Sequence, residues 1–319
     1  MKNNNKILIT GGAGYIGQNL INYFLKDKWK ISVIDNLSTS KKINPNLKKE
    51  INFYNINLVK EKKVRQFFEK NSFDLIIHLA AFSGVKEFNK NVMRSFNNNV
   101  LATKNLVLYG FKNNRTKLIF ASSAAVYGRV SEKKVTEGNI CRPANYYGIS
   151  KLACENIINN QLKNKKIHYA ILRYFNVVGT ILNFKTEKKI YSLLDIIAKN
   201  IKKKKYKIDI NGNKLNTKDG TPERDFIHID DLCKIHKKVN LYLNKNKEIV
   251  LNCGSGSRYS VLQIVSAFQK FTKKKFKISY KKANPEETQT ICSDNSLLKK
   301  LLKINVKKTK AQHYIQDYL

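Results

Sequence analysis

The sequence predicts an α/β protein built on a doubly wound parallel sheet, followed by a smaller C-terminal α+β lobe. Two observations carry this prediction. In the first half of the chain, short apolar runs alternate with segments of helical periodicity, which is the pattern of βαβ units. Beyond about Asn176 this alternation loosens. With 319 residues, of which 42% are hydrophobic, the chain can bury a core of this size.

Six apolar runs in the first half are predicted strands. In chain order they are Ile7 to Thr10, Ile31 to Asp35, Ile51 to Tyr54, Leu75 to Leu79, Leu118 to Ser122 and Tyr169 to Arg173. The segments between them, such as Val64 to Glu69 and Val100 to Tyr109, are amphipathic and are predicted helices. The strands therefore belong to a parallel sheet with helical crossovers.

The second half of the chain has a different pattern of predicted secondary structure. It contains a helix-like stretch from Ile190 to Lys199, a turn-rich segment from Asn211 to Thr221 and a helix-like segment from Val261 to Phe271. No clean linker precedes it. We therefore expect a first domain at residues 1–175 and a ligand-binding lobe at residues 176–319, packed together over a cleft. A ligand is expected where the carboxyl ends of the strands meet that cleft.

The net charge of +38 suggests a polyanionic partner, such as nucleic acid or an anionic membrane. However, the lysines are spread along the chain beside abundant Asn and Ile. Only Lys202 to Lys205 and Lys273 to Lys275 form tight runs, and no aromatic residues interleave them. We therefore expect solvated lysine-rich faces and no membrane partner, with RNA binding as a minor alternative.

Neither a targeting segment nor a cysteine framework is evident. The N-terminus does not resemble a signal peptide, and no apolar run approaches membrane-spanning length, so a soluble cytoplasmic protein is expected. The five cysteines are odd in number and never form a Cys-x-x-Cys pair, which predicts neither disulfides nor a metal site. They are Cys141, Cys154, Cys233, Cys253 and Cys292.

A glycine motif follows the first predicted strand and opens a predicted helix. Its members are Gly11, Gly14 and Gly17. Glycines in this context allow a tight turn, bring the backbone close to a pyrophosphate and let the helix pack on the strand. The helix N-terminus then presents N–H groups to the phosphates. This pattern predicts a dinucleotide site of the Rossmann type.

Asp35 ends the second predicted strand, about twenty residues after the glycines. A carboxylate at this place accepts hydrogen bonds from the adenosine ribose and repels a 2′-phosphate. NAD is therefore the expected cofactor, in preference to NADP. Asn36 adds a second polar group near the adenosine.

A serine pair and a tyrosine–lysine pair predict proton chemistry. Ser122 ends a predicted strand and Ser123 follows it, so their hydroxyls should lie at the carboxyl edge of the sheet. Tyr147 and Lys151 share one face if Tyr147 begins a helix. The spacing alone is weak in a lysine-rich chain, and the position after Ser123 gives it weight. A nearby ammonium favours ionisation of the phenol, which can then remove a proton from a sugar hydroxyl held by Ser123.

With these motifs the chain resembles the extended short-chain dehydrogenase/reductase family, its NAD-dependent epimerase/dehydratase branch and, within it, the UDP-glucose 4-epimerases. Further motifs fall in family order along nearly the whole chain: Thr10-Gly11-Gly12-Ala13-Gly14-Tyr15-Ile16-Gly17, Asp35-Asn36, His78-Leu79-Ala80-Ala81, Asn98-Asn99-Val100, Arg173-Tyr174-Phe175-Asn176-Val177-Val178-Gly179 and Arg224-Asp225-Phe226-Ile227-His228. The resemblance implies that Tyr147 deprotonates the 4-hydroxyl of a nucleotide-sugar while hydride passes from carbon 4 to tightly held NAD. A 4-keto sugar then turns over, and hydride returns to its opposite face.

The resemblance also implies the roles of individual residues and a homodimer formed through the helices that follow Asn98 and Tyr147. Catalysis is assigned to Tyr147, Lys151 and Ser123, with no metal. The implied cofactor site consists of Gly11, Gly14, Tyr15, Ile16, Gly17, Asp35, Asn36, Asn57, Leu58, Leu79, Ala80, Ala81, Asn98, Ser122, Tyr147, Lys151 and Tyr174. The implied substrate site consists of Ser123, Tyr147, Asn176, Ser192 and Arg224. The planar guanidinium of Arg224 suits the diphosphate.

Two alanines exclude other branches of this family. Ala124 and Ala125 stand where related 4,6-dehydratases carry an Asp-Glu pair, and related decarboxylases carry Glu at the position of Ala125. Elimination and decarboxylation therefore lack their carboxylates, whereas an epimerase needs only the tyrosine, a hydride acceptor and room for the keto sugar to rotate. His78 and His228 are expected to be structural, and Tyr127 is equally consistent with a core position and a second cofactor wall.

Some positions depart from the 4-epimerases. Asn57 replaces an adenine-contacting Asp, and Ser83 replaces a Lys. Tyr191-Ser192 replaces Asn-Asn, and Asn284-Pro285-Glu286-Glu287 replaces an Arg-x-Gly-Asp diphosphate clamp, so one phosphate-binding arginine is missing. Lys281 or Lys282 is the candidate replacement.

Ile291 replaces a bulky Tyr, which indicates room for a larger sugar. A UDP-N-acetylhexosamine 4-epimerase therefore stays open as an alternative. A nucleotide-sugar dehydrogenase or reductase of the same fold, releasing its cofactor at each turnover, is another. An RNA-binding protein on a Rossmann scaffold is the last.

Overall fold

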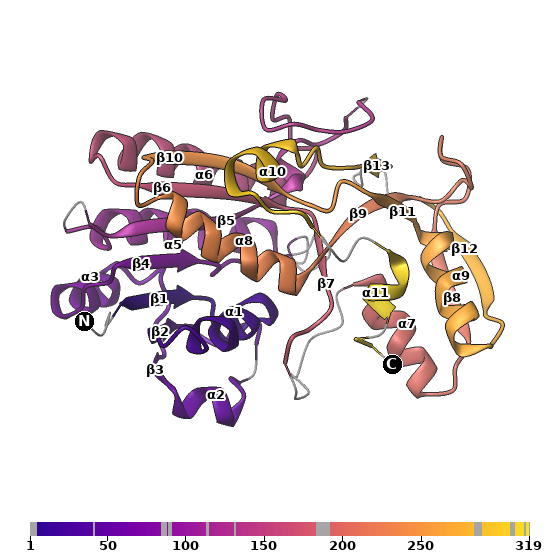
Figure 1. The fold of residues 1–319 in the computed structure, drawn as a ribbon, viewed down its shortest axis with the longest axis horizontal. Helices are drawn as coiled ribbons and strands as arrows, with labels where there is room; N and C mark the ends of the chain where they lie inside the picture. Colours follow the sequence, from indigo (N-terminus) through magenta and orange to yellow (C-terminus); the bar gives the residue numbers. More distant parts are fainter. Residues whose placement is uncertain are drawn as a thin grey trace.

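The computed structural model of the chain describes residues 5–40, 42–83, 88, 91–112, 115–130, 132–182, 192–283, 289–306, 310–315 and 317–318, without the side chains of 312 and 313. Its centre is a seven-stranded sheet in which every neighbouring pair is parallel (Figure 1). The strand order is β3 (Ile51–Tyr54), β2 (Lys30–Ile34), β1 (Lys6–Thr10), β4 (Leu75–His78), β5 (Lys117–Ser123), β6 (Tyr169–Tyr174) and β10 (Glu248–Cys253).

The first six of these strands confirm the strands predicted from the sequence, and the predicted doubly wound sheet is confirmed with them. The chain runs outward from β1 to β3 and then returns to place β4 on the other side of β1. The strand order thus reverses between β1 and β4. In an open α/β sheet, a crevice for ligands forms at this reversal, outside the carboxyl ends of the strands.

Helices cover both faces of the sheet. One face is covered by α1 (Tyr15–Leu25), α8 (Ile229–Tyr242) and α10 (Ser296–Leu302). The other is covered by α3 (Glu61–Lys70), α5 (Val92–Tyr109) and α6 (Tyr146–Asn164). Two short elements, α2 (Pro45–Lys49) and the 3₁₀ turn η1 (Ala124–Val126), lie in the connections.

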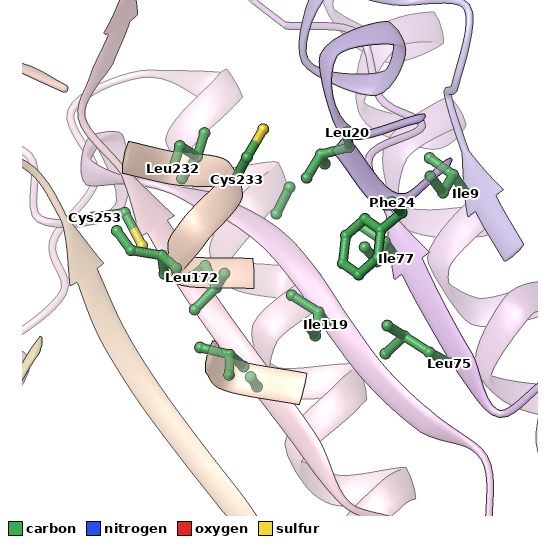
Figure 2. Packing of buried hydrophobic residues seen from close by; sticks show 14 of the residues in the cluster. Ile9, Leu20, Phe24, Leu75, Ile77, Ile119, Leu172, Leu232, Cys233 and Cys253 are labelled. Atoms are coloured by element: carbon green, nitrogen blue, oxygen red, sulfur yellow. The ribbon is translucent and has the colours of Figure 1, made fainter. Parts of the chain in front are cut away.

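Apart from the edge strand β3, which is only partly buried, the strands are apolar on both sides because both sides are buried. Along β1, Ile7 and Ile9 belong to the core under α1 and α8, whereas Leu8 belongs to the core under α3, α5 and α6. Figure 2 shows the first of these cores, in which Phe24 of α1 and Cys233 of α8 pack over the strands. This packing fixes the carboxyl ends of the strands, where the functional residues lie.

A second group of elements lies beyond the carboxyl ends of the sheet (Figure 1). Strand β9 (Glu223–His228) pairs with β7 (Asn176–Val178), β11 (Arg258–Ser260) and β13 (Thr290–Ile291). A two-stranded parallel sheet is formed by β8 (Lys207–Asn211) and β12 (Lys277–Lys281). The helices of this group are α7 (Leu193–Lys202), α9 (Val261–Thr272) and α11 (Ala311–Ile315), and they share a separate core with the strands.

The predicted boundary after residue 175 coincides with the start of β7. However, α8 packs on the large sheet, and β10 extends that sheet beside β6. The segments 229–253 and 296–302 therefore return to the first domain, so residues 176–319 are shared between the two parts. The division at 175 stays a prediction for the segments that form the second group.

Two further features bear on the expected class of protein. None of the helices in the described ranges has the length and apolar character needed to cross a membrane. All five cysteines are free thiols, and every one except Cys141 is buried.

Candidate active site

A cavity of about 420 Å³ opens at the carboxyl ends of the strands, where the sheet reverses its order. Loops after β1, β2, β3 and β4 line it together with the end of β5, the start of α6 and the start of α7. Every residue of the predicted catalytic and cofactor sites lies in this lining, and so does every predicted substrate residue except Arg224. Residues far apart in the sequence are therefore brought to one site.

The glycine turn forms the floor of one end of the cavity. Gly11 has a φ of +71°, and a Cβ placed on it would lie 2.7 Å from the backbone nitrogen of Ala80. Gly14 precedes α1, and no side chain caps that helix. A Cβ on Gly14 would lie 3.2 Å from the Gly11 carbonyl oxygen and 4.0 Å from the Ser40 hydroxyl oxygen. The backbone and the bare helix N-terminus thus fit a pyrophosphate.

Asp35 lies beside this turn at the end of β2. Its Oδ2 accepts the N–H of Ala13 at 3.0 Å, and its Oδ1 accepts the N–H of Leu37 at 2.8 Å. Burial raises the pKa of this carboxyl, and the two hydrogen bonds oppose that rise. Asn36 and Asn57 each accept a backbone N–H two residues further on, which fixes the loops around the adenosine end. This donor and acceptor set suits a ribose with free hydroxyls.

The reactive end of the cavity is built by β5 and α6. Helix α6 begins at Tyr146 because Asn145 caps it, accepting the N–H of Gly148 at 2.9 Å. One turn of this helix places Tyr147 and Lys151 together in the cavity lining. The half-buried Ser123 ends β5 and hydrogen-bonds to the Tyr147 side chain.

The pKa of Tyr147 differs from the sequence-based expectation. Burial raises it to about 12, and the hydrogen bond with Ser123 opposes that rise. The expected lowering of this pKa is therefore wrong for this structure, because removal of the phenol from water raises it and the opposing effect comes from Ser123. The ammonium of Lys151 instead donates to the Ala121 carbonyl at 2.7 Å and lies 4.9 Å from the centre of the Phe120 ring.

Lys151 should make NAD binding pH-dependent. Burial lowers the pKa of its ammonium to about 8, while Cys154 and Glu155 oppose that lowering. Below this pH the side chain is a cation with three donor protons, and above it the side chain is neutral. We therefore expect the affinity of the cofactor-stripped protein for NAD to fall as pH rises through about 8, by at most about tenfold per pH unit. Calorimetric titration across this range checks the prediction.

The matched variant for this experiment is Lys151→Met, which should bind NAD more weakly at neutral pH and show no decline through the same range. A wild-type affinity that stays constant between about pH 7 and about pH 9 would contradict the assignment of the titrating group.

The histidines of the motifs are structural, as expected. His78 is buried, with Nδ1 2.7 Å from the Thr10 hydroxyl and Nε2 3.1 Å from the Thr103 hydroxyl. Burial, with a smaller effect of Lys151, lowers its pKa to about 3, so the ring is neutral. His228 is buried and bonds through Nε2 to the Asp317 carboxylate at 2.5 Å.

Two tyrosines near the cavity face different surroundings. Tyr127 is buried among apolar residues, and its hydroxyl donates to Asn252 Oδ1 at 2.7 Å, so it is a core residue and not a cofactor wall. Tyr174 lines the cavity, while its hydroxyl lies 2.8 Å from Nε2 of His236 on α8. Burial raises the pKa of Tyr174 well above its usual value.

The substrate end contains Asn176 and Ser192. Asn176 donates to the backbone carbonyl of Asp225 at 3.1 Å. Ser192 caps α7 in a reciprocal pair with Asp195, and both line the cavity. Asp195 was not predicted from the sequence, although the serine-to-acid spacing of a capping box was a signal for it. Of the other lining residues, Ala13, Phe175 and Val177 lie within the motifs and Ser83 is a departure from them, but none was assigned to a site. The remaining lining residues lie outside the motifs and were missed, namely Gln18, Ile34, Ser38, Thr39, Ser40, Ile56, Phe82, Ala102 and Ala121.

Arg224 lies on β9, outside the cavity lining. Its Nη1 donates to the carbonyls of Glu223 at 2.9 Å and Gln289 at 3.0 Å. It is adjacent to Asp225, whose carbonyl holds Asn176, so its role at the diphosphate stays a proposal. Lys281, a candidate for the missing arginine, pairs with Asp209 at 2.6 Å.

Two of the departures, Tyr191 and Asn284 to Glu287, lie outside the described residues. Ile291 is buried and packs in a cluster that contains Ala124 and Phe175. No group of three or more His, Cys, Asp or Glu residues within the described ranges could hold a metal ion.

Comparisons with known proteins agree with this geometry. The model of the NAD dependent epimerase/dehydratase family matches residues 7–254. The UDP-glucose 4-epimerase of Dictyostelium discoideum is 33% identical over 281 residues, which cover 84% of this chain and 82% of that protein.

Solved structures give the same result. The UDP-Glc/GlcNAc 4-epimerase of Campylobacter jejuni is 32% identical with a TM-score of 0.82, covering 98% of this chain and 99% of that one. The UDP-glucose 4-epimerase of Bifidobacterium longum, solved in complex with NAD+ and UDP, is 28% identical with a TM-score of 0.89, covering 98% and 97%.

Proposed function

This chain belongs to the NAD-dependent epimerase/dehydratase family, and from that premise we propose that it is an isomerase that interconverts UDP-glucose and UDP-galactose with NAD as cofactor. One observation carries the proposal. A single cavity contains the glycine turn and Asp35 at one end and Ser123, Tyr147 and Lys151 at the other. A dinucleotide site and a proton-transfer site thus meet in one place.

Each group of residues has its own role in the proposed reaction. When bound, NAD supplies the hydride acceptor. The glycine turn and the N-terminus of α1 hold the pyrophosphate, and Asp35 accepts the hydroxyls of the adenosine ribose. Ser123 and Tyr147 hold the 4-hydroxyl of the sugar, and Tyr147 takes its proton and later returns it. The hydrogen bond from Ser123 favours the phenolate that this transfer requires.

The side chains beside Ser123 support epimerisation over elimination. Ala124 is buried in an apolar cluster, and Ala125 carries no group that titrates. An elimination needs an additional acid and base at this place. A reversible oxidation at one carbon needs neither, because the proton and the hydride removed from the sugar both return to it.

The direct test is incubation of the purified protein with UDP-glucose and UDP-galactose separately. We expect each to yield the other without stoichiometric release of NADH. A stoichiometric absorbance change on adding NAD or NADH would favour the dehydrogenase or reductase alternative instead. If no nucleotide-sugar is converted, the proposal fails.

A second candidate is a UDP-N-acetylhexosamine 4-epimerase, and Ile291 favours it. Ile291 is buried in a cluster with Ala124 and the cavity-lining Phe175. Its side chain is smaller than the Tyr that it replaces, and this difference supports room for an N-acetyl group. The Campylobacter relative is described as acting on both sugar types. Adding UDP-N-acetylglucosamine to the same experiment decides this point, since the absence of any UDP-N-acetylgalactosamine product excludes the second candidate.

The protein is proposed to act as a homodimer through α5 and α6, which pack against each other. Large apolar side chains on these helices are exposed, namely Met93 (66%), Leu101 (38%), Leu108 (45%) and Ile149 (41%). Covering such a surface drives association. Sedimentation should therefore show a dimer, and Leu101→Glu combined with Ile149→Glu should shift it to a monomer. A wild-type protein that sediments as a monomer at micromolar concentration would contradict this arrangement.

The proposed reaction places the protein in carbohydrate metabolism, in the use of galactose, with a cytoplasmic location. RNA binding stays the minor alternative. Retention on RNA at physiological salt, with unchanged phenotype on loss of Tyr147, would favour it.

A further inference from the structure

A buried ion pair lies beneath the reactive end of the cavity. The side chains of Glu155 and Arg173 are only 2% and 8% exposed. Arg173 donates from Nη2 to Oε2 of Glu155 at 2.8 Å and from Nε to Oε1 at 3.2 Å. Burying two charges costs several kcal/mol of desolvation, so a buried pair is weak support for stability. The contacts of the pair indicate that it contributes to the geometry of the active site.

Each partner comes from an element that carries functional residues. Glu155 lies on α6, one turn beyond Lys151 and two turns beyond Tyr147. Arg173 lies on β6, directly before the cavity-lining Tyr174. Neither Glu155 nor Arg173 is in the lining of the cavity, so they act through other residues.

The pair anchors both ends of the segment that carries Ser123. At one end, the hydroxyl of Ser122 donates to Oε1 of Glu155. At the other end, Nη1 of Arg173 donates to the hydroxyl of Tyr127 at 3.0 Å, and the guanidinium lies 5.0 Å from the centre of the Tyr127 ring. Ser123 lies between these two anchors, so its position relative to α6 depends on them.

The anchoring continues into the neighbouring strand. The Tyr127 hydroxyl donates to Asn252 on β10, and Arg173 donates to the backbone carbonyl of Glu137 at 3.3 Å. The Glu137 side chain accepts the N–H of Asn252 at 2.7 Å. The network is therefore closed, and the Arg173 guanidinium is fixed from several sides.

We propose that the Glu155–Arg173 pair positions the reaction, by holding the segment Ser122–Tyr127 against α6 at the separation that lets Ser123 and Tyr147 bind one sugar hydroxyl. This inference rests on the proposed function. Glu155 and Arg173 are positioning residues, since neither lines the cavity and Glu155 reaches it only through the side chain of Ser122. A protein without this pair would keep the catalytic side chains but lose their positions relative to one another.

Glu155 also influences the charge at Lys151. Among the described residues, the ionisable groups that face Lys151 are Tyr147, Cys154 and Glu155 on its own helix and the neutral His78 on β4. Strand β5 contributes the Ala121 carbonyl and the Phe120 ring. Glu155 favours the protonated amine. Its replacement by a neutral residue should therefore move the titration of Lys151 to lower pH.

The test compares Glu155→Gln and Arg173→Met with a matched pair on the surface. Arg65 and Glu69 form an Arg–Glu contact of 2.9 Å on α3 with side chains 65% and 49% exposed, so Glu69→Gln and Arg65→Met are the controls. We expect kcat to fall by about 10- to 100-fold in the buried variants, because small displacements of reacting groups have effects of this size. KM and NAD affinity at neutral pH should change by less than about threefold, and the controls should match wild type.

Two milder variants keep the test decisive if the others do not fold. Tyr127→Phe removes one anchor and leaves the ring packing, and Arg173→Lys keeps the charge but cannot bind Glu155 and Tyr127 together. Both should lower kcat with KM retained. In Glu155→Gln, the pH at which NAD affinity declines should also shift downward, which a purely structural role would not produce.

Wild-type kcat in folded Glu155→Gln and Tyr127→Phe, with only the melting temperature lowered, would overturn the proposal. If the wild-type protein converts no nucleotide-sugar, the proposed function fails separately. In that case, crystal structures of the variants measure the position of Ser123 relative to Tyr147. An unchanged distance between Ser123 Oγ and the Tyr147 hydroxyl in Tyr127→Phe and Glu155→Gln overturns it, and a lengthened distance supports it.

Discussion

Replacing Tyr147 with Phe should lower kcat by about 100- to 10 000-fold, the range that general acid–base catalysis contributes. The substitution deletes the hydroxyl that bonds to Ser123 and takes the sugar proton, but it keeps the ring. That ring packs edge-on against Phe88 at 6.0 Å, a contact that Phe preserves. NAD affinity should therefore change by less than about threefold. Steady-state turnover and cofactor titration on the same preparation check both statements.

The control for this variant is Tyr280→Phe, which removes an exposed phenol outside the cavity lining and should leave turnover unchanged. Turnover of Tyr147→Phe within about threefold of wild type would remove Tyr147 as the proton acceptor. Loss of NAD binding in this variant would instead show that the phenol serves the cofactor.

Replacing Gly17 with Ala should lower NAD affinity by at least about 100-fold, equivalent to about 2.7 kcal/mol. A Cβ at this position would lie 2.6 Å from Gly12 Cα and 2.7 Å from the carbonyl oxygens of Gly11 and Gly12. These are backbone atoms of the turn itself, so relief requires α1 to move away from the turn. The movement displaces the helix N-terminus that faces the pyrophosphate. Calorimetry with NAD measures the effect.

Gly138→Ala is the matched control, because its nearest neighbour would be the Thr136 hydroxyl at 3.9 Å. It should bind NAD as wild type does. A folded Gly17→Ala protein with wild-type affinity, verified by circular dichroism, would contradict the placement of the dinucleotide at this turn.

Most of the fold followed from local patterns. The strands β1, β2, β4, β5 and β6 are mainly runs of apolar residues buried on both faces, and such runs are visible without tertiary information. The edge strand β3 is only partly buried. Strand β10 and helix α8 were assigned to the second lobe because their residues lie within the range 176–319. Their return to the large sheet depends on packing between distant residues, such as Cys233 of α8 against the strands, which no local pattern encodes.

The cavity residues were predicted for a related reason. Gly11, Asp35, Ser123 and Tyr147 each follow or begin an element whose end was recognisable, and parallel strands bring such ends to one edge. The raised pKa of Tyr147 was not predictable, because it depends on how completely the assembled cavity removes the phenol from water.

The Glu155–Arg173 pair was also missed. Its two members lie 18 residues apart on a helix and a strand. Arg173 was recognised only as part of a family motif, and nothing in that motif names a helical carboxylate as its partner. Only the packing of α6 on the sheet brings them together.

The most direct test of a reversible oxidation at one sugar carbon uses UDP-galactose that carries deuterium at carbon 4. The hydride removed from the sugar should return to the same carbon, on the opposite face. We therefore expect UDP-glucose that retains deuterium at carbon 4, with none in free NADH and none in water. Loss of the label from carbon 4 in the product, or its appearance in released NADH, would contradict this account.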